Sequence, residues 1–370
     1  MGLRMGLLAV ATCATVTALA SWQFPAAAKQ AEQTPSAGPA KAAAATPDPN
    51  KVVLDVVVTD KNGPPIGGLA QTDFTVLDNG APQQMTSFRA LTGREEPIAT
   101  LIVIDAVNES VANVSYARQE LGKFLKSESG SLARPMQIAV LTEKGLQLLG
   151  PSSIKGADLS AQLDGADTVL RTVRTGSGIY GVQELNAIST GAFSALARGE
   201  LGAPGRKMVI VFSPGWSLMM SADVMYEVKT QLKIWQSAAQ INYDLRMARI
   251  TLQMIDPLGT NDVRDSAFYY KRFVNGITKL SGAEFGDLGL QVITTQSGGM
   301  VLTESNDLGA ELRRCLADLT NYYEVTYAVP AWTGKSKAGE PQWHKVEVKM
   351  AANAQTARTR TGYYVAPPAK

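Results

Sequence analysis

Apolar runs alternate with amphipathic stretches through the middle of the chain, from Pro97 to about residue 320. The runs LIVID and KMVIVF are each followed by a segment whose apolar residues recur at helical spacing, and the strand-like runs ITLQMI and GGMVLT precede a last such segment at Leu308 to Leu319. Strands that are apolar on both faces and alternate with helices are typical of a parallel sheet covered on both sides. The pattern predicts one doubly wound, mainly parallel α/β domain over residues 97–320.

The pattern changes to a period of two on either side of this domain. Residues 51–92 contain short strand-like runs separated by turn signals at Asn62-Gly63-Pro64 and Asp78-Asn79-Gly80, and residues 321–366 alternate in the same way. The turn residues are interpreted as supplying backbone geometry only. Each block is too short to bury a core alone, so we expect the two to pair into a single β-sandwich module.

The first residues carry an export signal. A single Arg4 precedes an apolar run from Leu7 to about Ala20, and small residues follow, which is the pattern of a signal peptide over residues 1–28. The run is shorter than the roughly 20 residues that span a bilayer. A retained membrane anchor and lipidation at Cys13 are the alternatives. Residues 29–50 are rich in Pro and Ala and predict a flexible linker, so we expect a periplasmic, surface or secreted protein.

Composition excludes several classes of partner and of chemistry. The 370 residues include 35 basic and 33 acidic side chains, a net charge of +2, which gives no basic surface for nucleic acid or an anionic membrane. The two cysteines are Cys13 and Cys315, so the mature chain is expected to lack an internal disulfide. Cys315 lies on an apolar helix face and predicts a buried thiol. His344, the one histidine, is interpreted as a half-exposed strand residue.

Signals for enzymatic chemistry are weak. GSGIYG, residues 176–181, matches the glycine spacing of a dinucleotide-binding loop, but the segment before it is too polar for a core strand. No nucleophile elbow of the form G-x-S-x-G occurs. Asp256 ends a strand beside Pro257 and is given a turn role. Trp216 follows the central strand, and its ring is expected either in the core or, exposed, in a protein-binding surface.

Several segments in order resemble the VWFA-related domain family described chiefly from acidobacteria, a branch of the von Willebrand factor type A proteins. They are LDVVVTDKNGPPIGGLAQTDFTVLDNG, LIVIDAVN, GRKMVIVFSPG, IDPLG, SGGMVLTESNDLGAELRRCLADLTNYYEVTY and RTGYYVAP. The resemblance covers nearly all of residues 52–366. It implies a von Willebrand factor A-like domain of Rossmann type.

The resemblance also implies a place for Mg²⁺, at the carboxyl edge of the sheet. The family motif is D-x-S-x-S, then a threonine and a second aspartate on other loops. This chain has Asp105 but Val107 and Glu109 in place of the serines, Ser177 in place of the threonine, and Pro214 in place of the second aspartate. Only Asp105, Glu109 and Ser177 remain as potential ligands, too few for an ion that is costly to dehydrate. We therefore predict a degenerate site without a metal cofactor, with Asp105 capping nearby backbone N–H groups.

The resemblance implies a non-enzymatic protein that binds a protein partner, and the pattern of the first residues predicts that it is exported. Ligands of open α/β sheets bind beyond the carboxyl ends of the strands, where the strand order reverses. The candidate residues of this edge are Asp105, Asn108, Glu109, Ser110, Ser177, Tyr180, Ser213, Trp216 and Asp256. The alternatives are an Mg-dependent adhesion domain with a rebuilt metal site, and a hydrolase or nucleotide-dependent enzyme.

Overall fold

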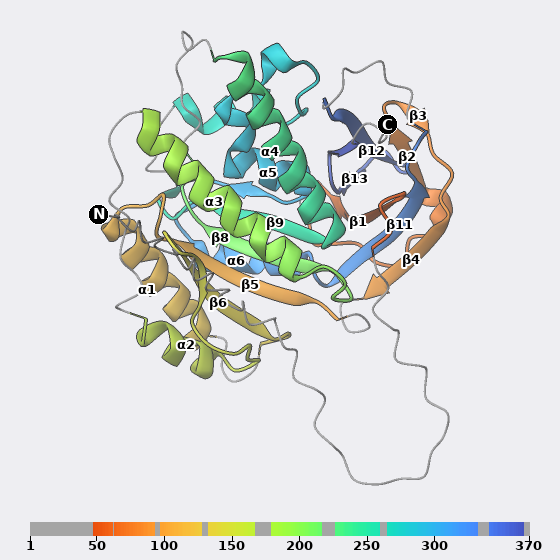
Figure 1. Cartoon of the computed structure of the whole chain (residues 1–370). Coiled ribbons are helices and arrows are strands. Elements are labelled where there is room, and N and C mark those ends of the chain that lie inside the picture. Colours follow the sequence, from red (N-terminus) through yellow and green to blue (C-terminus); the bar gives the residue numbers. More distant parts are fainter. Residues whose placement is uncertain are drawn as a thin grey trace, which may run out of the picture.

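The fold is taken from a computed structural model of the whole chain (Figure 1). The structure describes residues 47–61, 63–92, 97–127, 132–166, 179–216, 226–259, 265–331 and 340–365. The expected signal peptide and most of the linker lie outside these ranges.

A six-stranded sheet forms the centre of the molecule, with strand order β10-β9-β8-β5-β6-β7. All neighbours are parallel except β7, which forms an antiparallel hairpin with β6. The strands are β5 (Ala99–Asp105), β6 (Met136–Thr142), β7 (Gly145–Leu148), β8 (Lys207–Phe212), β9 (Ile250–Ile255) and β10 (Val301–Leu302). The predicted doubly wound, mainly parallel sheet is confirmed.

Six helices cover the two faces of this sheet among the described residues (Figure 1). One face carries α1 (Val111–Ser127), α2 (Gly156–Asp164) and α6 (Leu308–Ala317), and the other carries α3 (Ile179–Gly199), α4 (Val228–Met247) and α5 (Leu290–Ser297). Short 3-10 turns are η1 (Gln71–Asp73), η3 (Asp265–Arg272), η4 (Leu280–Gly282) and η5 (Phe285–Leu288).

The core follows from the alternation of side chains along each strand. In β5, Ile102 and Ile104 pack against the layer of α1, α2 and α6, whereas Leu101 and Val103 pack against the layer of α3, α4 and α5. All four are fully buried. Each such aliphatic side chain stabilises the fold by about 1.5–3 kcal/mol relative to exposure, which explains why the apolar runs of the sequence are unbroken.

The flanking β segments pair with each other, as predicted. One sheet has the order β13-β1-β11-β4 and the other β14-β12-β2-β3. Both sheets mix early and late strands, since β1 pairs with β11 and β2 pairs with β12. The strands are β1 (Lys51–Asp60), β2 (Phe74–Asp78), β3 (Ala81–Pro82), β4 (Ser87–Thr92), β11 (Asn321–Ala328), β12 (Gln342–Met350), β13 (Gln355–Arg358) and β14 (Gly362–Val365).

Two sequence interpretations in this β module are wrong. His344 is 5% exposed rather than half-exposed, and its Nδ1 lies 2.7 Å from Asp78 Oδ1. Asp78 is more than a turn residue, because its Oδ2 accepts hydrogen bonds from the hydroxyls of Tyr327 and Tyr363. The inner faces of the two sheets thus enclose a polar cluster that the alternation of the sequence did not reveal.

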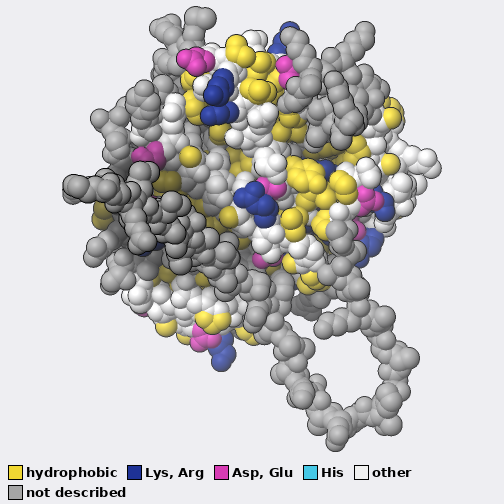
Figure 2. All heavy atoms as spheres, in the orientation of Figure 1, with side chains coloured by type: hydrophobic (Ala, Val, Ile, Leu, Met, Phe, Trp, Pro, Cys, Tyr) yellow, Lys and Arg dark blue, Asp and Glu magenta, His cyan; other side chains and the backbone are white. Residues whose placement is uncertain are grey.

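The visible surface shows no concentration of one charge. In Figure 2 the lysine and arginine side chains are scattered among acidic, polar and apolar ones, which fits the near-balanced charge of the chain.

None of the helices within the described ranges combines the length and the hydropathy needed to cross a bilayer.

Candidate functional site at the carboxyl edge of the sheet

The strand order reverses at β5. This strand lies between β6, which follows it in sequence, and β8, from which the sheet continues to β9 and β10. The chain therefore leaves β5 and β8 toward opposite helix layers, and the loops after these two strands border a crevice at the carboxyl edge. These loops carry Asp105–Ser110 and Ser213–Trp216. The fold thus brings together two groups of candidate residues more than one hundred positions apart.

Asp105 ends β5 and is completely buried. Its Oδ1 accepts hydrogen bonds from the backbone N–H groups of Val107 and Asn108, both at 3.0 Å. The side-chain amide of Asn108 donates to both carboxylate oxygens, at 3.1 and 2.9 Å. Ser213, which follows β8, donates its hydroxyl to Oδ2 at 2.8 Å. The carboxylate therefore ties the β5 loop to the β8 loop.

Burial raises the pKa of Asp105 above its ordinary value of 3.8, and these hydrogen bonds oppose the shift. The amide of Asn108 also donates to the hydroxyl of Ser189, a residue of α3, at 3.0 Å. The Asp105 carboxylate and the Asn108 amide thus link three elements, the β5 loop, the β8 loop and α3. The geometry is that of a structural latch, consistent with the capping role expected for Asp105.

Glu109 lies next to this latch and is also buried. Its Oε2 accepts from the side chain of Asn113 at 2.8 Å and from the backbone N–H of Ser110 at 3.0 Å. Burial, with smaller contributions from the nearby carboxylates of Asp256 and Asp105, raises the pKa of Glu109 to about 7. The three acidic residues are therefore close enough to interact electrostatically.

The side chains at this edge do not fit Mg²⁺. Such an ion needs six oxygen ligands in near-octahedral geometry, yet the oxygens of Asp105 accept five hydrogen bonds from four donor groups of this chain. Ser213 uses its hydroxyl as the donor to Asp105, and Val107 and Pro214 have no side-chain oxygen. Asp256 Oδ1 accepts from the backbone of Leu258 at 2.9 Å. Within the described ranges, no three Asp, Glu, His or Cys side chains form a cluster suited to a metal ion.

The remaining candidate residues have different places. Ser177 lies outside the described residues, and Tyr180 lies in the first turn of α3. Trp216 is 1% exposed and packs against Phe193 of α3, with ring centroids 5.5 Å apart. Of the two positions expected for Trp216, in the core or in an exposed binding surface, the structure shows the core position. Its ring therefore offers no surface to a partner. Ser110 is exposed and precedes α1, and its hydroxyl accepts from the backbone N–H of Asn113 in the first turn of that helix, as an N-cap residue does.

Three residues of this edge were not found from the sequence. Ser189 completes the Asp105 latch from α3. Val111 is 59% exposed and Tyr116 is 37% exposed, and both belong to the first part of α1. Val111 shares the helical spacing of the buried Val114, Ala117 and Leu121, and this spacing would have predicted burial. Its exposure arises because it is the first residue of its helix.

Comparisons with known proteins concern the fold. No family model matches the chain, and no curated protein matches it. Among solved structures, it is similar to human Sec24c of the COPII coat (9% identity, TM-score 0.35, covering 73% of this chain and 44% of that one) and to proximal thread matrix protein 1 of the mussel byssus (9%, 0.36, 65% and 50%). It is also similar to a von Willebrand factor type A protein from Catenulispora acidiphila (10%, 0.31, 86% and 74%).

The chain spans half or less of the length of Sec24c and of the mussel protein. The described sheet, with helix layers on both faces, gives the central domain a doubly wound, mainly parallel α/β fold of Rossmann type. That fold is the one implied by the resemblance in sequence.

Proposed function

We propose that this chain is an exported, non-enzymatic interaction protein whose carboxyl-edge rim binds a protein partner without a metal ion. The observation that carries the proposal is the saturation of Asp105: the donors of Asn108 and Ser213 occupy the carboxylate that would hold a cation. A partner would therefore contact the side chains of the rim directly instead of completing the coordination of an ion.

The exposed part of the rim has the mixed character of an interaction surface. Val111 and Tyr116 on α1 present apolar area, and the Tyr116 hydroxyl donates to the backbone oxygen of Asn306 in the loop before α6 at 3.4 Å. Polar side chains of Ser110 and Glu304 are exposed around them. Exposed apolar residues with a polar surround are typical of protein-binding surfaces.

The arrangement of reactive side chains favours binding over catalysis. His344 lies in the β module and pairs with Asp78, not with a serine or cysteine of the rim. The Cys315 thiol is fully buried, and burial raises its pKa well above the ordinary value, which keeps it protonated. Export is proposed because residues 1–28 have the pattern of a signal peptide. An exported protein would lie in the periplasm, at the cell surface or outside the cell.

The first prediction tests the rim through Val111. The protein would be cross-linked in its native cell envelope and the recovered partners quantified for wild type, Val111→Arg and Leu201→Arg. Leu201 is a matched control, because it is 46% exposed but lies between α3 and β8, at the opposite edge of the sheet. We expect Val111→Arg to reduce recovery of a specific partner about tenfold, as for a central interface residue.

Leu201→Arg is expected to leave recovery unchanged. Equal recovery with both variants would show that the rim is not the binding surface. The same experiment with EDTA should recover the same partner, and its loss would instead favour a rebuilt divalent-cation site around Glu109.

A further inference from the structure

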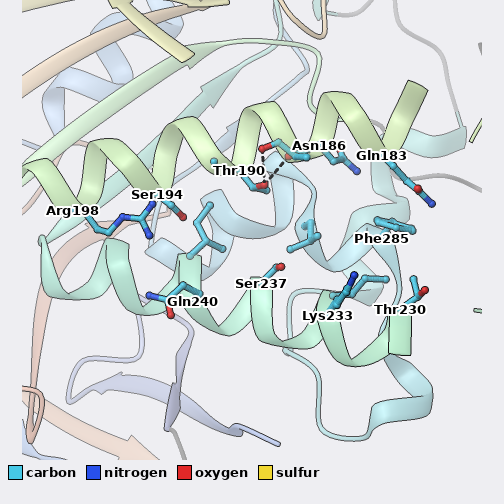
Figure 3. Close-up of a pocket in the computed structure, with 15 residues that line it drawn as sticks. Gln183, Asn186, Thr190, Ser194, Arg198, Thr230, Lys233, Ser237, Gln240 and Phe285 are labelled. Carbon is cyan, nitrogen blue, oxygen red and sulfur yellow. Dashed lines mark hydrogen bonds between the residues drawn. The ribbon is translucent and has the colours of Figure 1, made fainter. Parts of the chain in front are cut away.

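A groove of about 510 Å³ lies between α3 and α4, on the side of these helices away from the Asp105 latch. Figure 3 shows side chains of the two helices pointing toward one another across it, with Phe285 of η5 at one end. This volume is within the range of small-molecule sites in proteins. None of the residues of the proposed protein-binding rim lines this groove.

Polar residues face the groove from both helices at helical spacing. On α3 they include Gln183, Thr190 and Ser194, which are seven and four residues apart, and on α4 they include Thr230, Lys233 and Ser237, which are three and four apart. Residues at these intervals lie on one face of a helix. Each helix has an apolar face, which packs in the core, and a polar face. The polar faces of α3 and α4 therefore both point into the groove.

Several of these groups have unused hydrogen-bonding capacity. Among the described residues, the side chains of Ser194, Ser237 and Lys233 have no hydrogen-bond or ion-pair partner. Ser194 is 9% exposed as a residue, and a ligand in the groove could donate to or accept from its hydroxyl.

The charge of the groove is positive. No Asp or Glu is among the described residues that line it, whereas Arg198 and Lys233 are. Arg198 lies 3.7 Å from the carboxylate of Asp244, which offsets its charge. Lys233 is left as the ammonium group that can attract an anion, and an ammonium–carboxylate hydrogen bond is stronger than a neutral one.

Phe285 gives one end of the groove a flat apolar wall. Tyr226 packs edge-on against its ring, with centroids 5.3 Å apart and an interplanar angle of 79°. In Figure 3, Phe285 and Lys233 lie at the same end of the groove. An aromatic face, an ammonium group and a row of hydroxyls and amides are thus close together. A ligand that matches all three has an apolar ring face, an anionic group and many hydroxyls.

We propose that this groove binds an acidic saccharide. The carboxylate of one uronic acid unit pairs with Lys233, and the C–H face of its ring packs on Phe285. Its hydroxyls and those of the adjoining unit exchange hydrogen bonds with Thr230 and Ser237. A neutral sugar lacks the first contact and a simple organic acid lacks the other two. This site is independent of the proposed protein-binding rim.

The second prediction is tested by titration calorimetry with the full chain. The probes are digalacturonic acid and α-1,4-galactobiose, which has the same linkage but no carboxylate. We expect digalacturonic acid to bind at least tenfold more tightly than galactobiose. Lys233→Met should weaken its binding about tenfold, as the loss of a charged hydrogen bond requires. Lys229→Met, an exposed lysine of the same helix outside the groove, is the control and should bind as wild type.

A second variant tests occupancy of the volume itself. A Cβ atom added at Gly191 would meet no atom within 4 Å, so a leucine side chain at this position starts in open space within the groove, and replacing a helical glycine favours the helix. We expect this variant to stay folded by circular dichroism and to lose binding. Absence of digalacturonic acid binding by wild type, equal affinity for the two disaccharides, or full binding by Lys233→Met or Gly191→Leu would each overturn the proposal.

Discussion

At the scale of single residues, burial decides how the carboxylates of this protein behave. Asp105 and Asp287 are both buried and both accept hydrogen bonds from backbone N–H groups, yet burial raises the pKa of each. For Asp287 the pKa is raised to about 7. It accepts from the backbone N–H of Glu284 at 2.9 Å at the start of η5, where it closes the first turn. Its charge is therefore unfavourable in the folded protein at neutral pH.

The third prediction concerns Asp287→Asn. A carboxyl whose pKa is raised on folding binds its proton more tightly in the folded state, so its contribution to stability is complete below pH 3.8 and is lost as pH rises toward about 7. The asparagine keeps an oxygen acceptor but cannot ionise. We therefore expect the free energy of unfolding of the variant, relative to that of wild type, to be larger at pH 8 than at pH 4.5. Urea unfolding at the two pH values measures it.

Asp73→Asn, at the matching position of η1, controls for the amide substitution itself, because Asp73 makes the same hydrogen bond to its N-cap residue. A stability difference for Asp287→Asn that does not change between the two pH values would contradict the prediction.

At the scale of elements, the two sheets of the β module are joined by one buried carboxylate. Asp78 ends β2, and it receives the hydroxyl of Tyr327 from β11 in the opposite sheet and that of Tyr363 from β14. His344 of β12 completes the cluster and stacks on Tyr363 at 5.1 Å. Four strands therefore depend on one acceptor group, in addition to the apolar contacts between the sheets.

The fourth prediction is that Asp78→Ala destabilises the protein by about 3 kcal/mol or more. The substitution leaves three buried polar groups without their acceptor, and each unsatisfied group costs about 1–3 kcal/mol. Tyr327→Phe, which removes one donor and leaves the acceptor with two partners, should cost about 1 kcal/mol. Urea unfolding measures both. Equal losses for the two variants would mean that the cluster does not act as a unit.

At the scale of the whole molecule, charged side chains fasten the β module to the α/β domain. Arg249, between α4 and β9, contacts Asp55 of β1 at 2.5 Å and Glu324 of β11 at 2.7 Å. Arg246 of α4 donates to the backbone oxygen of Lys51 at 3.0 Å. These groups are mostly buried, so each needs its partner in place. The contacts hold the rim at a fixed position relative to the β module.

The fifth prediction is that Arg249→Met uncouples the two parts. Removing one partner of a buried charge network costs about 3 kcal/mol or more, and we expect the calorimetric unfolding transition to broaden or split. Lys345→Met, which breaks the exposed pair of Lys345 and Glu347, is the control and should cost less than about 1 kcal/mol. A single, sharp transition with the same midpoint for both variants would contradict the coupling.

The sequence identified much of this fold because apolar periodicity is a local property. The unbroken apolar runs of β5, β8 and β9 are those of strands buried on both faces. The two-residue alternation of the flanking segments is that of strands buried on one face. It also found Asp105, since an acidic residue at the end of a buried strand stands out against its neighbours. The roles of Ser189 and of the Asp78–His344 pair were not predicted, because the local sequence around a serine or aspartate does not indicate which distant residue it will hydrogen-bond.

By itself, then, the sequence determined the layered sheet, the pairing of the two β segments and the buried position of Cys315, since each follows from where apolar residues recur. Only the tertiary structure decided which polar groups meet: Asp78 with Tyr363, 285 residues apart, and Asp105 with Ser213, 108 apart. It also placed Trp216 in the core and opened the groove between α3 and α4. Periodicity records whether a side chain faces the core or water, whereas hydrogen bonds depend on a partner that only the folded chain brings within reach.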